Sequence, residues 1–360
     1  MRAGSLRRCA EGRDVSTGLA YSEAFLGHET GARHPERADR LRAIVAQLRA
    51  SGTWDELGVW EPAEADEATL ELIHSATHVA RVREFIARGG GHIDADTVVS
   101  AGSWAAALRA VGGAVEAVKR VSDGDLDNAF CLVRPPGHHA TPDQAMGFCL
   151  FNNVAIAAAW LLSSKRAEKI AILDYDVHHG NGTQDAFYER DDVLYISTHQ
   201  YPLYPGTGHW HERGAGAGAG YTLNLALPPG SGDDVYAGAL EQIIEPAVRR
   251  YAPDFVLVSL GFDAFWADPL ASLRLSIAGA YTPLLRSACT LAAEQCTGRL
   301  VVALEGGYNL EALGTGTDAA CRLLLGQEPR PDPLGPSPEQ LSLRQVEPLL
   351  GSIRSLHKLV

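Results

Sequence analysis

Two carboxylates and two imidazoles lie within six positions in the segment ILDYDVHHGNG, residues 172–182. Apolar residues precede them, which indicates that they follow a buried strand. Alternate side chains of an extended chain share one side, so the D-x-D-x-H spacing predicts one wall formed by Asp174, Asp176 and His178. Such a wall needs a cation or hydrogen-bond donors to offset the free-energy cost of burying its charged groups. Two carboxylates and an imidazole suit zinc at an open catalytic site, and ferrous iron would also fit.

A catalytic metal needs a third protein ligand and an open coordination position. Asp263, in SLGFDAF, is the natural candidate because it follows another apolar run and has glycine and aromatic neighbours. Taken alone, an aspartate at a strand end is more often a helix cap, and a single histidine is more often a hydrogen-bonded core residue. The joint pattern nevertheless favours a metal site made by Asp176, His178 and Asp263.

A second histidine pair, His138 and His139, stands in RPPGHHA. Two prolines and a glycine restrict the preceding backbone, which predicts a stiff turn. The pair could itself ligate metal, but we favour acid–base roles, since histidine titrates nearest neutral pH. Asp174 is then expected to orient His138, and Asn181 to orient His139, each through the ring nitrogen that faces away from substrate.

A tyrosine on a double-glycine turn completes the set of candidate groups. Tyr308, in EGGYN, follows an apolar run that ends near Glu305. A phenol delivered there could donate a hydrogen bond to a developing oxyanion. A packed tyrosine bonded to backbone would be the preferred interpretation if Tyr308 stood alone.

The elements that must position these groups alternate along the chain. Short, nearly all-apolar runs predict strands, and amphipathic stretches between them predict helices, which together indicate an α/β fold with a mostly parallel sheet covered on both faces. The polar clusters follow four of these runs, and the carboxyl ends of strands are where such sheets gather function. The predicted strands are 18–21, 129–133, 170–174, 193–198, 221–225, 255–260 and 300–305, and the predicted helices are 36–50, 103–121, 153–163, 233–251, 276–296 and 342–357.

Composition limits the class of protein. No apolar run is long enough for a membrane-spanning helix, and the basic N-terminal stretch lacks the apolar core of a secretion signal. The six scattered cysteines favour reduced thiols in a cytoplasmic protein. The net charge of −13 argues against a nucleic-acid partner. We expect residues 1–17 to be a flexible lead and residues 18–360 to form one domain.

A glycine-rich patch, GAGAGAG at residues 214–220, has two interpretations. It could be a flexible surface loop, or its glycines could let the backbone pass close to a site or an ion.

The assembled motifs resemble those of the histone deacetylase family, specifically the class II-like bacterial amidohydrolases. They run in family order from about residue 18 to residue 325. The matching segments are HPER, RPPGHHA, GFCLFNNVAIAA, LDYDVHHGNGTQDAFY, YPGTG, ERGAGAGAGYTLN, LVSLGFDA, DPL and LEGGYN.

This resemblance implies the arginase-deacetylase fold, a three-layer α/β/α arrangement with a central eight-stranded parallel sheet and a metal at the base of a narrow tube. It implies deacetylation of N6-acetyl-lysine, in a protein or a small acetylated amine. The implied roles are zinc ligation by Asp176, His178 and Asp263, general base and acid for His139, electrostatic support from His138, carbonyl polarisation by Tyr308, aromatic walls from Phe148 and Tyr204 beside Gly147, and an inner acetate channel near Arg37.

The resemblance also implies two structural sites for a monovalent cation, usually potassium. The inner one would use the side chain of Asp174 together with backbone and hydroxyl groups nearby, and the outer one would use carbonyls beside the glycine-rich patch. The inner set is Asp174, Asp176, His178, Ser197 and Thr198, and the outer set is Phe187, Arg190, Val193 and Tyr221.

Two positions bear on how closely the chain follows the family pattern. Tyr204 stands where phenylalanine is common, whereas Tyr308 is kept where some members carry histidine.

Three alternatives remain. Relatives that prefer acetylpolyamines tend to carry glutamate at the position of Leu270, which disfavours that substrate. A non-catalytic acyl-lysine binding or acetoin-utilisation-type accessory protein is an alternative of another class. An arginase-like ureohydrolase would need further acids that are missing. The sequence leaves the oligomeric state open, with a homo-oligomer as one alternative.

Overall fold

Eight parallel strands form the central sheet of the computed structural model, which describes residues 15–359. Their order across the sheet is β2-β1-β5-β10-β9-β6-β7-β8, and every neighbouring pair runs parallel. The strands are β1 (Thr17–Ala20), β2 (Gly58–Trp60), β5 (Asn128–Cys131), β6 (Ile170–Asp174), β7 (Val193–Gln200), β8 (Thr222–Leu227), β9 (Phe255–Leu260) and β10 (Leu300–Leu304). The predicted eight-stranded parallel sheet is confirmed.

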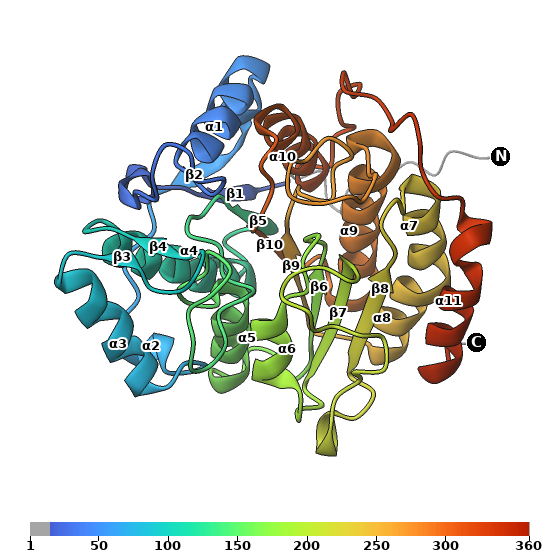
Figure 1. The fold of residues 1–360 in the computed structure, drawn as a ribbon, viewed down its shortest axis with the longest axis horizontal. Coiled ribbons are helices and arrows are strands. Elements are labelled where there is room, and N and C mark those ends of the chain that lie inside the picture. Colours follow the sequence, from blue (N-terminus) through green and yellow to red (C-terminus); the bar gives the residue numbers. More distant parts are fainter. Residues whose placement is uncertain (1–14, 360) are drawn as a thin grey trace.

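Helices cover both faces of this sheet (Figure 1). One layer contains α4 (Ser103–Asp123), α5 (Asn153–Ser163) and α6 (Asn181–Phe187), with α4 packed on α5 and on β5. The other layer contains α1 (Asp39–Ser51), α7 (Asp233–Ala239), α8 (Glu245–Tyr251), α9 (Thr282–Cys296), α10 (Leu310–Leu324) and α11 (Leu343–Leu356). Within it α10 packs between α1 and α9, and α11 packs on α7.

Smaller elements fill the connections. They are η1 (Glu23–Gly27), η2 (Thr53–Glu56), α2 (Glu67–Leu70), α3 (Ala76–Ala87), η3 (Gly216–Gly218), the π-helical turns η4 (Leu240–Ile244) and η5 (Ile277–Tyr281), and an antiparallel pair of β3 (Gly91–His92) and β4 (Val98–Val99). Across the described residues, no helix is both long enough and apolar enough to cross a membrane.

Three predicted elements have the observed bounds, and most others differ by one to three residues at their ends. Strands 170–174 and 255–260 and helix 153–163 match β6, β9 and α5. The predicted helix 233–251 is continuous but passes through the π-helical turn η4. Strand β2 was missed because it has three residues at the sheet edge, two of them exposed. The predicted flexible lead falls mainly on residues 1–14, outside the described residues, and Thr17 already lies in β1.

Four neighbouring strands carry the four polar clusters. Strands β5, β10, β9 and β6 are adjacent in the sheet although the chain visits them in a different order. Their register aligns Ala303 with Cys131, Leu304 with Leu260, and Asp174 with Ser259. The loops that follow these strands therefore begin at nearly the same level and meet at one edge of the sheet.

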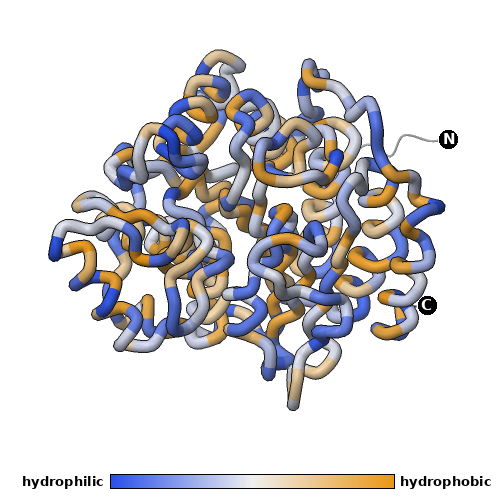
Figure 2. The backbone as a smooth tube through the Cα atoms, in the orientation of Figure 1, coloured by the Kyte–Doolittle hydropathy of each residue, from blue (hydrophilic) through white to orange (hydrophobic). Residues whose placement is uncertain are grey.

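Hydrophobic burial holds this frame in place. Figure 2 shows hydrophobic segments gathered in the interior and hydrophilic segments on the outer loops. Strands β6, β9 and β10 are buried at every position. A strand that is covered by helices on both sides cannot alternate polar and apolar residues, which explains the continuous apolar runs in the sequence.

Truncating the core at β9 should destabilise the whole sheet. Val258 is fully buried, and Val258→Ala is expected to lower the free energy of unfolding by about 2–3 kcal/mol, since two methyl groups leave a cavity. Val59, in the edge strand β2, is 38% exposed, and Val59→Ala should change the free energy of unfolding by less than about 0.5 kcal/mol. Chemical denaturation of both variants checks this, and equal losses would contradict the burial argument.

Candidate active site

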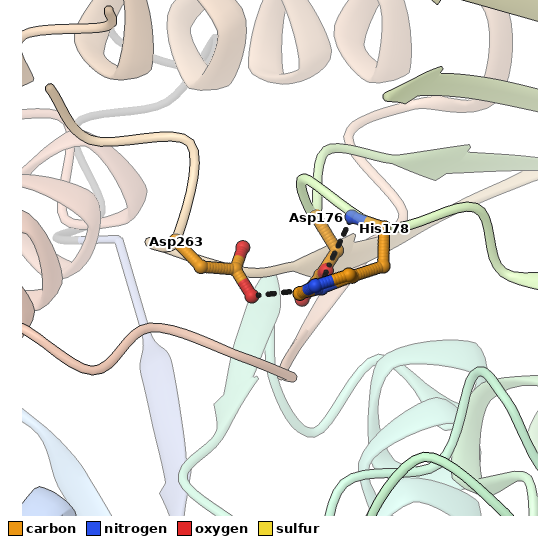
Figure 3. A group of neighbouring side chains, drawn as sticks. All are labelled: Asp176, His178 and Asp263. Atoms are coloured by element: carbon orange, nitrogen blue, oxygen red, sulfur yellow. Dashed lines mark hydrogen bonds and ion pairs between the residues drawn. The ribbon is translucent and has the colours of Figure 1, made fainter. Parts of the chain in front are cut away.

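Three ligand-type side chains converge above the carboxyl ends of β6 and β9 (Figure 3). His178 Nδ1 lies 3.1 Å from Asp176 Oδ1 and 3.4 Å from Asp263 Oδ2. One ligand atom from each residue falls within 4.8 Å of the others. Both carboxylates are fully buried, and the His178 side chain is 12% exposed. The predicted convergence of these residues from two strand ends is therefore present.

The surroundings of the trio fit a divalent cation. Asp263 Oδ2 is buried and has no hydrogen-bond partner among the described residues. Burial and the neighbouring Asp176 carboxylate both raise the pKa of Asp263, so the two acids destabilise one another as anions. A side chain at Gly261 or Gly306 would overlap the oxygens of Asp176 and Asp263. Glycine at both positions keeps open the space that these oxygens face.

Asp174 lies apart from the trio, contrary to the expected single wall. Strand β6 ends at Asp174 and the chain then bends, so the side-to-side alternation of an extended segment stops there. Asp174 Oδ2 instead accepts hydrogen bonds from the Tyr195 hydroxyl at 2.9 Å and lies 3.1 Å from His138 Nδ1. The carboxylate is thus placed to orient His138.

The two histidines of the RPPGHHA turn have opposite electrostatic surroundings. Their rings lie 4.0 Å apart, and Asn181 Oδ1 is 2.8 Å from His139 Nδ1. Burial opposes protonation of His138, but Asp176 and Asp174 outweigh it and raise its pKa to about 10. Burial, His138 and His178 lower the pKa of His139 well below its usual value. The pair therefore combines a cationic ring with a neutral one.

Glu305 fastens the histidine turn, a role that the sequence interpretation missed. Its Oε2 accepts hydrogen bonds from the backbone N–H of Gly137 at 2.7 Å and of His138 at 3.2 Å. Its Oε1 accepts from the Ser259 hydroxyl at 3.1 Å. Burial raises the pKa of this carboxyl to about 7. The sequence signal that could have indicated this role was an acid placed directly after an all-apolar strand.

Tyr308 is positioned by a second buried acid. Asp268 Oδ2 accepts hydrogen bonds from the backbone N–H of Tyr308 at 2.8 Å and of Asn309 at 3.3 Å, while its Oδ1 accepts from Leu270 at 2.9 Å. Burial raises the pKa of the Tyr308 phenol well above its usual value, so the hydroxyl keeps its proton.

The arginine beside Tyr308 is Arg40, and Arg37 lies elsewhere. Arg40 is fully buried, its guanidinium lies 5.2 Å from the centre of the Tyr308 ring, and its Nε donates to the Gly307 carbonyl at 2.7 Å. Arg37 is about a third exposed and pairs with Asp39 at 3.1 Å. The expected inner position for Arg37 is therefore wrong. Helix α1 begins at Asp39, and its first turn directs Arg40 inward.

A narrow cavity of about 220 Å³ leads to the trio. Its lining includes His138, His139, His178 and Tyr308, together with Gly147, Phe148, Tyr204, Leu270 and, at the rim, Asp96. Phe148 and Gly147 both adopt positive φ angles, 68° and 56°. A side chain at Gly147 would overlap the His139 ring, so glycine lets this loop approach the histidine. The expected wall residues therefore surround one cavity.

The expected cation-site residues fall into two groups. In the inner group, Asp174 and Ser197 pair across β6 and β7, and the Thr198 hydroxyl donates to the Asp174 carbonyl at 3.3 Å. In the outer group, the Phe187 carbonyl accepts from Arg190 N–H at 3.0 Å, and the Tyr221 carbonyl accepts from Tyr195 N–H at 2.9 Å. Val193 begins β7 nearby. Potassium binding by either group stays a prediction.

Comparison with known proteins agrees with this architecture. Residues 34–324 match the histone deacetylase domain. The chain belongs to the histone deacetylase family. It is 46% identical over 297 residues to a probable deacetylase of Archaeoglobus fulgidus, covering 82% of each chain. It is 40% identical to a histone deacetylase-like amidohydrolase of Pseudomonas aeruginosa, covering 81% of this chain and 75% of that one.

A solved structure extends the similarity to three dimensions. The crystal structure of the HDA15 HD domain superposes with a TM-score of 0.85 at 35% sequence identity, and the match covers 95% of this chain and 94% of that one. The predicted family and fold are thereby confirmed.

A methyl group added at Gly306 should weaken metal binding. It would overlap Asp263 Oδ2 and crowd Asp176 Oδ2, so Gly306→Ala is expected to lower divalent-metal affinity by about 10- to 100-fold. Competition with a metallochromic indicator measures this. Gly351→Ala is the matched control, because a side chain there meets open space. Unchanged metal affinity in Gly306→Ala would show that the trio is not the metal site.

Proposed function

We propose that this protein is a zinc-dependent deacetylase that hydrolyses the amide of N6-acetyl-lysine. The observation that carries the proposal is the convergence of Asp176, His178 and Asp263 at the floor of a cavity that also exposes His139 and Tyr308. A divalent ion held by these three ligands supplies Lewis-acid activation of the amide carbonyl and of water. Ferrous iron suits the same ligands.

His139 is suited to move the proton. The Asn181 Oδ1 atom can only accept, so His139 Nδ1 donates to it and Nε2 carries the free lone pair. The lowered pKa of His139 keeps that lone pair available near neutral pH. Nε2 takes a proton from the attacking water and later delivers it to the leaving nitrogen. The C–N bond breaks, and water plus amide become acetate and the free amine.

His138 and Tyr308 stabilise the negative charge that develops during this step. His138, with a pKa raised to about 10, stays cationic beside His139. The phenol of Tyr308 stays protonated and donates a hydrogen bond to the carbonyl oxygen as it becomes an oxyanion. Asp268 and Arg40 hold the tyrosine loop in place through its backbone.

The cavity walls suit a slender alkyl chain. Phe148 and Tyr204 line it from opposite loops, and Tyr204 packs edge-on against His139 with ring centres 5.2 Å apart. Leu270 adds an apolar contact at the rim and Asp96 adds one carboxylate. The four-carbon lysine side chain fits such a tube, and the apolar rim at Leu270 favours it over an acetylated polyamine.

The direct test is hydrolysis of an acetyl-lysine peptide by the zinc-loaded protein, run beside acetylspermidine. We expect faster turnover of the peptide, loss of activity after chelation, and recovery with zinc. Preference for acetylspermidine would assign the small-amine class instead. Tight peptide binding without hydrolysis would identify a non-catalytic acyl-lysine binding protein and overturn the proposal.

Removing the phenol hydroxyl isolates its role. Tyr308→Phe should lower kcat by about 10²–10³, the usual loss for one oxyanion donor, while bound zinc stays unchanged. Tyr201→Phe is a control, since that phenol does not line the cavity. Steady-state kinetics and metal analysis measure both quantities. Wild-type turnover in Tyr308→Phe would refute the assigned role.

A further inference from the structure

A second cavity, of about 420 Å³, lies at the opposite edge of the sheet. Lys169 directly precedes β6 and Tyr221 directly precedes β8, so the cavity opens at the amino ends of strands whose carboxyl ends face the candidate active site. The ends of α8 and α11, which lie next to one another in Figure 1, form another side. We call this cavity the basal cleft.

The basal cleft gathers positive charge on an acidic protein. Four cationic side chains line it, and none has a carboxylate within 4.0 Å among residues 15–359, although the chain carries a net charge of −13. They are Lys169, Arg213, Arg250 and Lys358. Two nearby acids already have partners, since Asp192 pairs with Arg190 at 2.7 Å and Asp254 accepts from the backbone N–H of Lys169 at 2.9 Å, whereas Asp191 makes no ion pair among residues 15–359.

Helix capping accounts for only one of these cations. Arg250 Nη1 donates to the carbonyls of His357 and Lys358 at 2.7 and 3.2 Å, where α11 ends and its exposed carbonyls favour positive charge. Lys169 Nζ lies 5.4 Å from the centre of the Tyr251 ring. The Arg213 guanidinium makes no hydrogen bond with any described residue. Positive charges this close repel one another, and an anion bound between them would offset that repulsion.

An unpartnered buried nitrogen faces the same cleft. His357 is 6% exposed and lines the cleft, and its Nε2 has no hydrogen-bond partner among the described residues. Burial, Arg250 and Arg213 lower the pKa of His357 to about 4 against the opposing effect of a hydrogen bond with the Gly220 backbone, so the ring is neutral. Buried polar atoms are normally satisfied, which makes this nitrogen a second sign of a missing ligand.

The glycine-rich patch forms one wall of the basal cleft. Ala219, Gly220 and Tyr221 line it, and Gly220 has a φ of 98°, which favours glycine. A side chain at Gly218 would overlap the backbone at Tyr188 and Arg190, so glycine at this position lets the patch pack against that turn. The wall next to the cations therefore combines the small residues Ala219 and Gly220 with Tyr221.

We propose that the basal cleft binds the phosphate group of a small phosphorylated molecule. Arg213 presents a planar fork that matches two phosphate oxygens, and Lys169 adds a point charge. The unpartnered Nε2 of His357 offers one further polar contact in the same cleft. The cleft holds a phosphate with a small attached group, and Tyr221 offers that group an aromatic edge. This site is independent of the deacetylase proposal, since it lies at the other end of the strands.

Isothermal titration calorimetry with inorganic phosphate and with adenosine monophosphate tests this, at ionic strength fixed with sodium chloride. We expect both probes to bind the full-length protein. Tighter binding of the nucleotide would assign a nucleoside phosphate, and equal binding would assign the phosphate alone. The double variant Lys169→Gln, Arg213→Gln should bind at least about tenfold more weakly, because both side chains are exposed and their loss leaves the fold intact.

One control variant and one further test variant make the result decisive. Arg249→Gln removes an exposed cation of helix α8, next to Arg250, that already pairs with Glu245 and Glu294. This variant should bind phosphate like the unmodified protein. His357→Phe keeps the ring but removes its nitrogens, and it should also weaken binding. Absence of binding, or phosphate binding that persists in the double variant, would overturn the proposal, the latter because the candidate active site is intact there.

Discussion

The burial of two carboxylates beside one imidazole is the constraint on which the site depends. Asp176 and Asp263 are both fully buried, and burial together with the neighbouring Asp176 carboxylate raises the pKa of Asp263. Burying such a pair as anions costs less when a cation or hydrogen-bond donors face the oxygens. The backbone shows the consequence at Gly261 and Gly306, because a side chain at either position would overlap the oxygens of Asp176 and Asp263.

Further buried acids hold the loops that surround this charge. Glu305 joins the histidine turn to β9 and β10, and Asp268 holds the tyrosine loop by its backbone amides. On the outer side, Glu36 receives hydrogen bonds from the buried Arg40 and Arg134. Hydrogen bonds to charged groups are stronger than neutral ones, so they can fix loops that lack secondary structure. The candidate site thus lies on irregular backbone that buried acids hold through hydrogen bonds.

Sequence patterns predicted most of the frame because its signals are local. Strand β6, strand β9 and helix α5 are long uniform apolar or helical runs, and their bounds were correct. Strand β2 is short and half exposed, so it leaves no such run. Arg37 and Arg40 are three positions apart in one polar stretch, and only the inward turn at the start of α1 distinguishes them. The role of Glu305 depends on partners more than 40 residues away.

By itself, the sequence determined which groups are candidates for the chemistry and that they follow buried strands, since residue type and hydrophobic run length are local properties. Tertiary structure alone decided that β5, β6, β9 and β10 become neighbours, because strand order depends on how the crossover helices pack. It also decided that the chain bends after β6, so Asp174 does not share one wall with Asp176 and His178 as the spacing suggested. The gathering of the basal cleft's cations is likewise a product of packing, since Lys169 and Lys358 lie far apart in the chain.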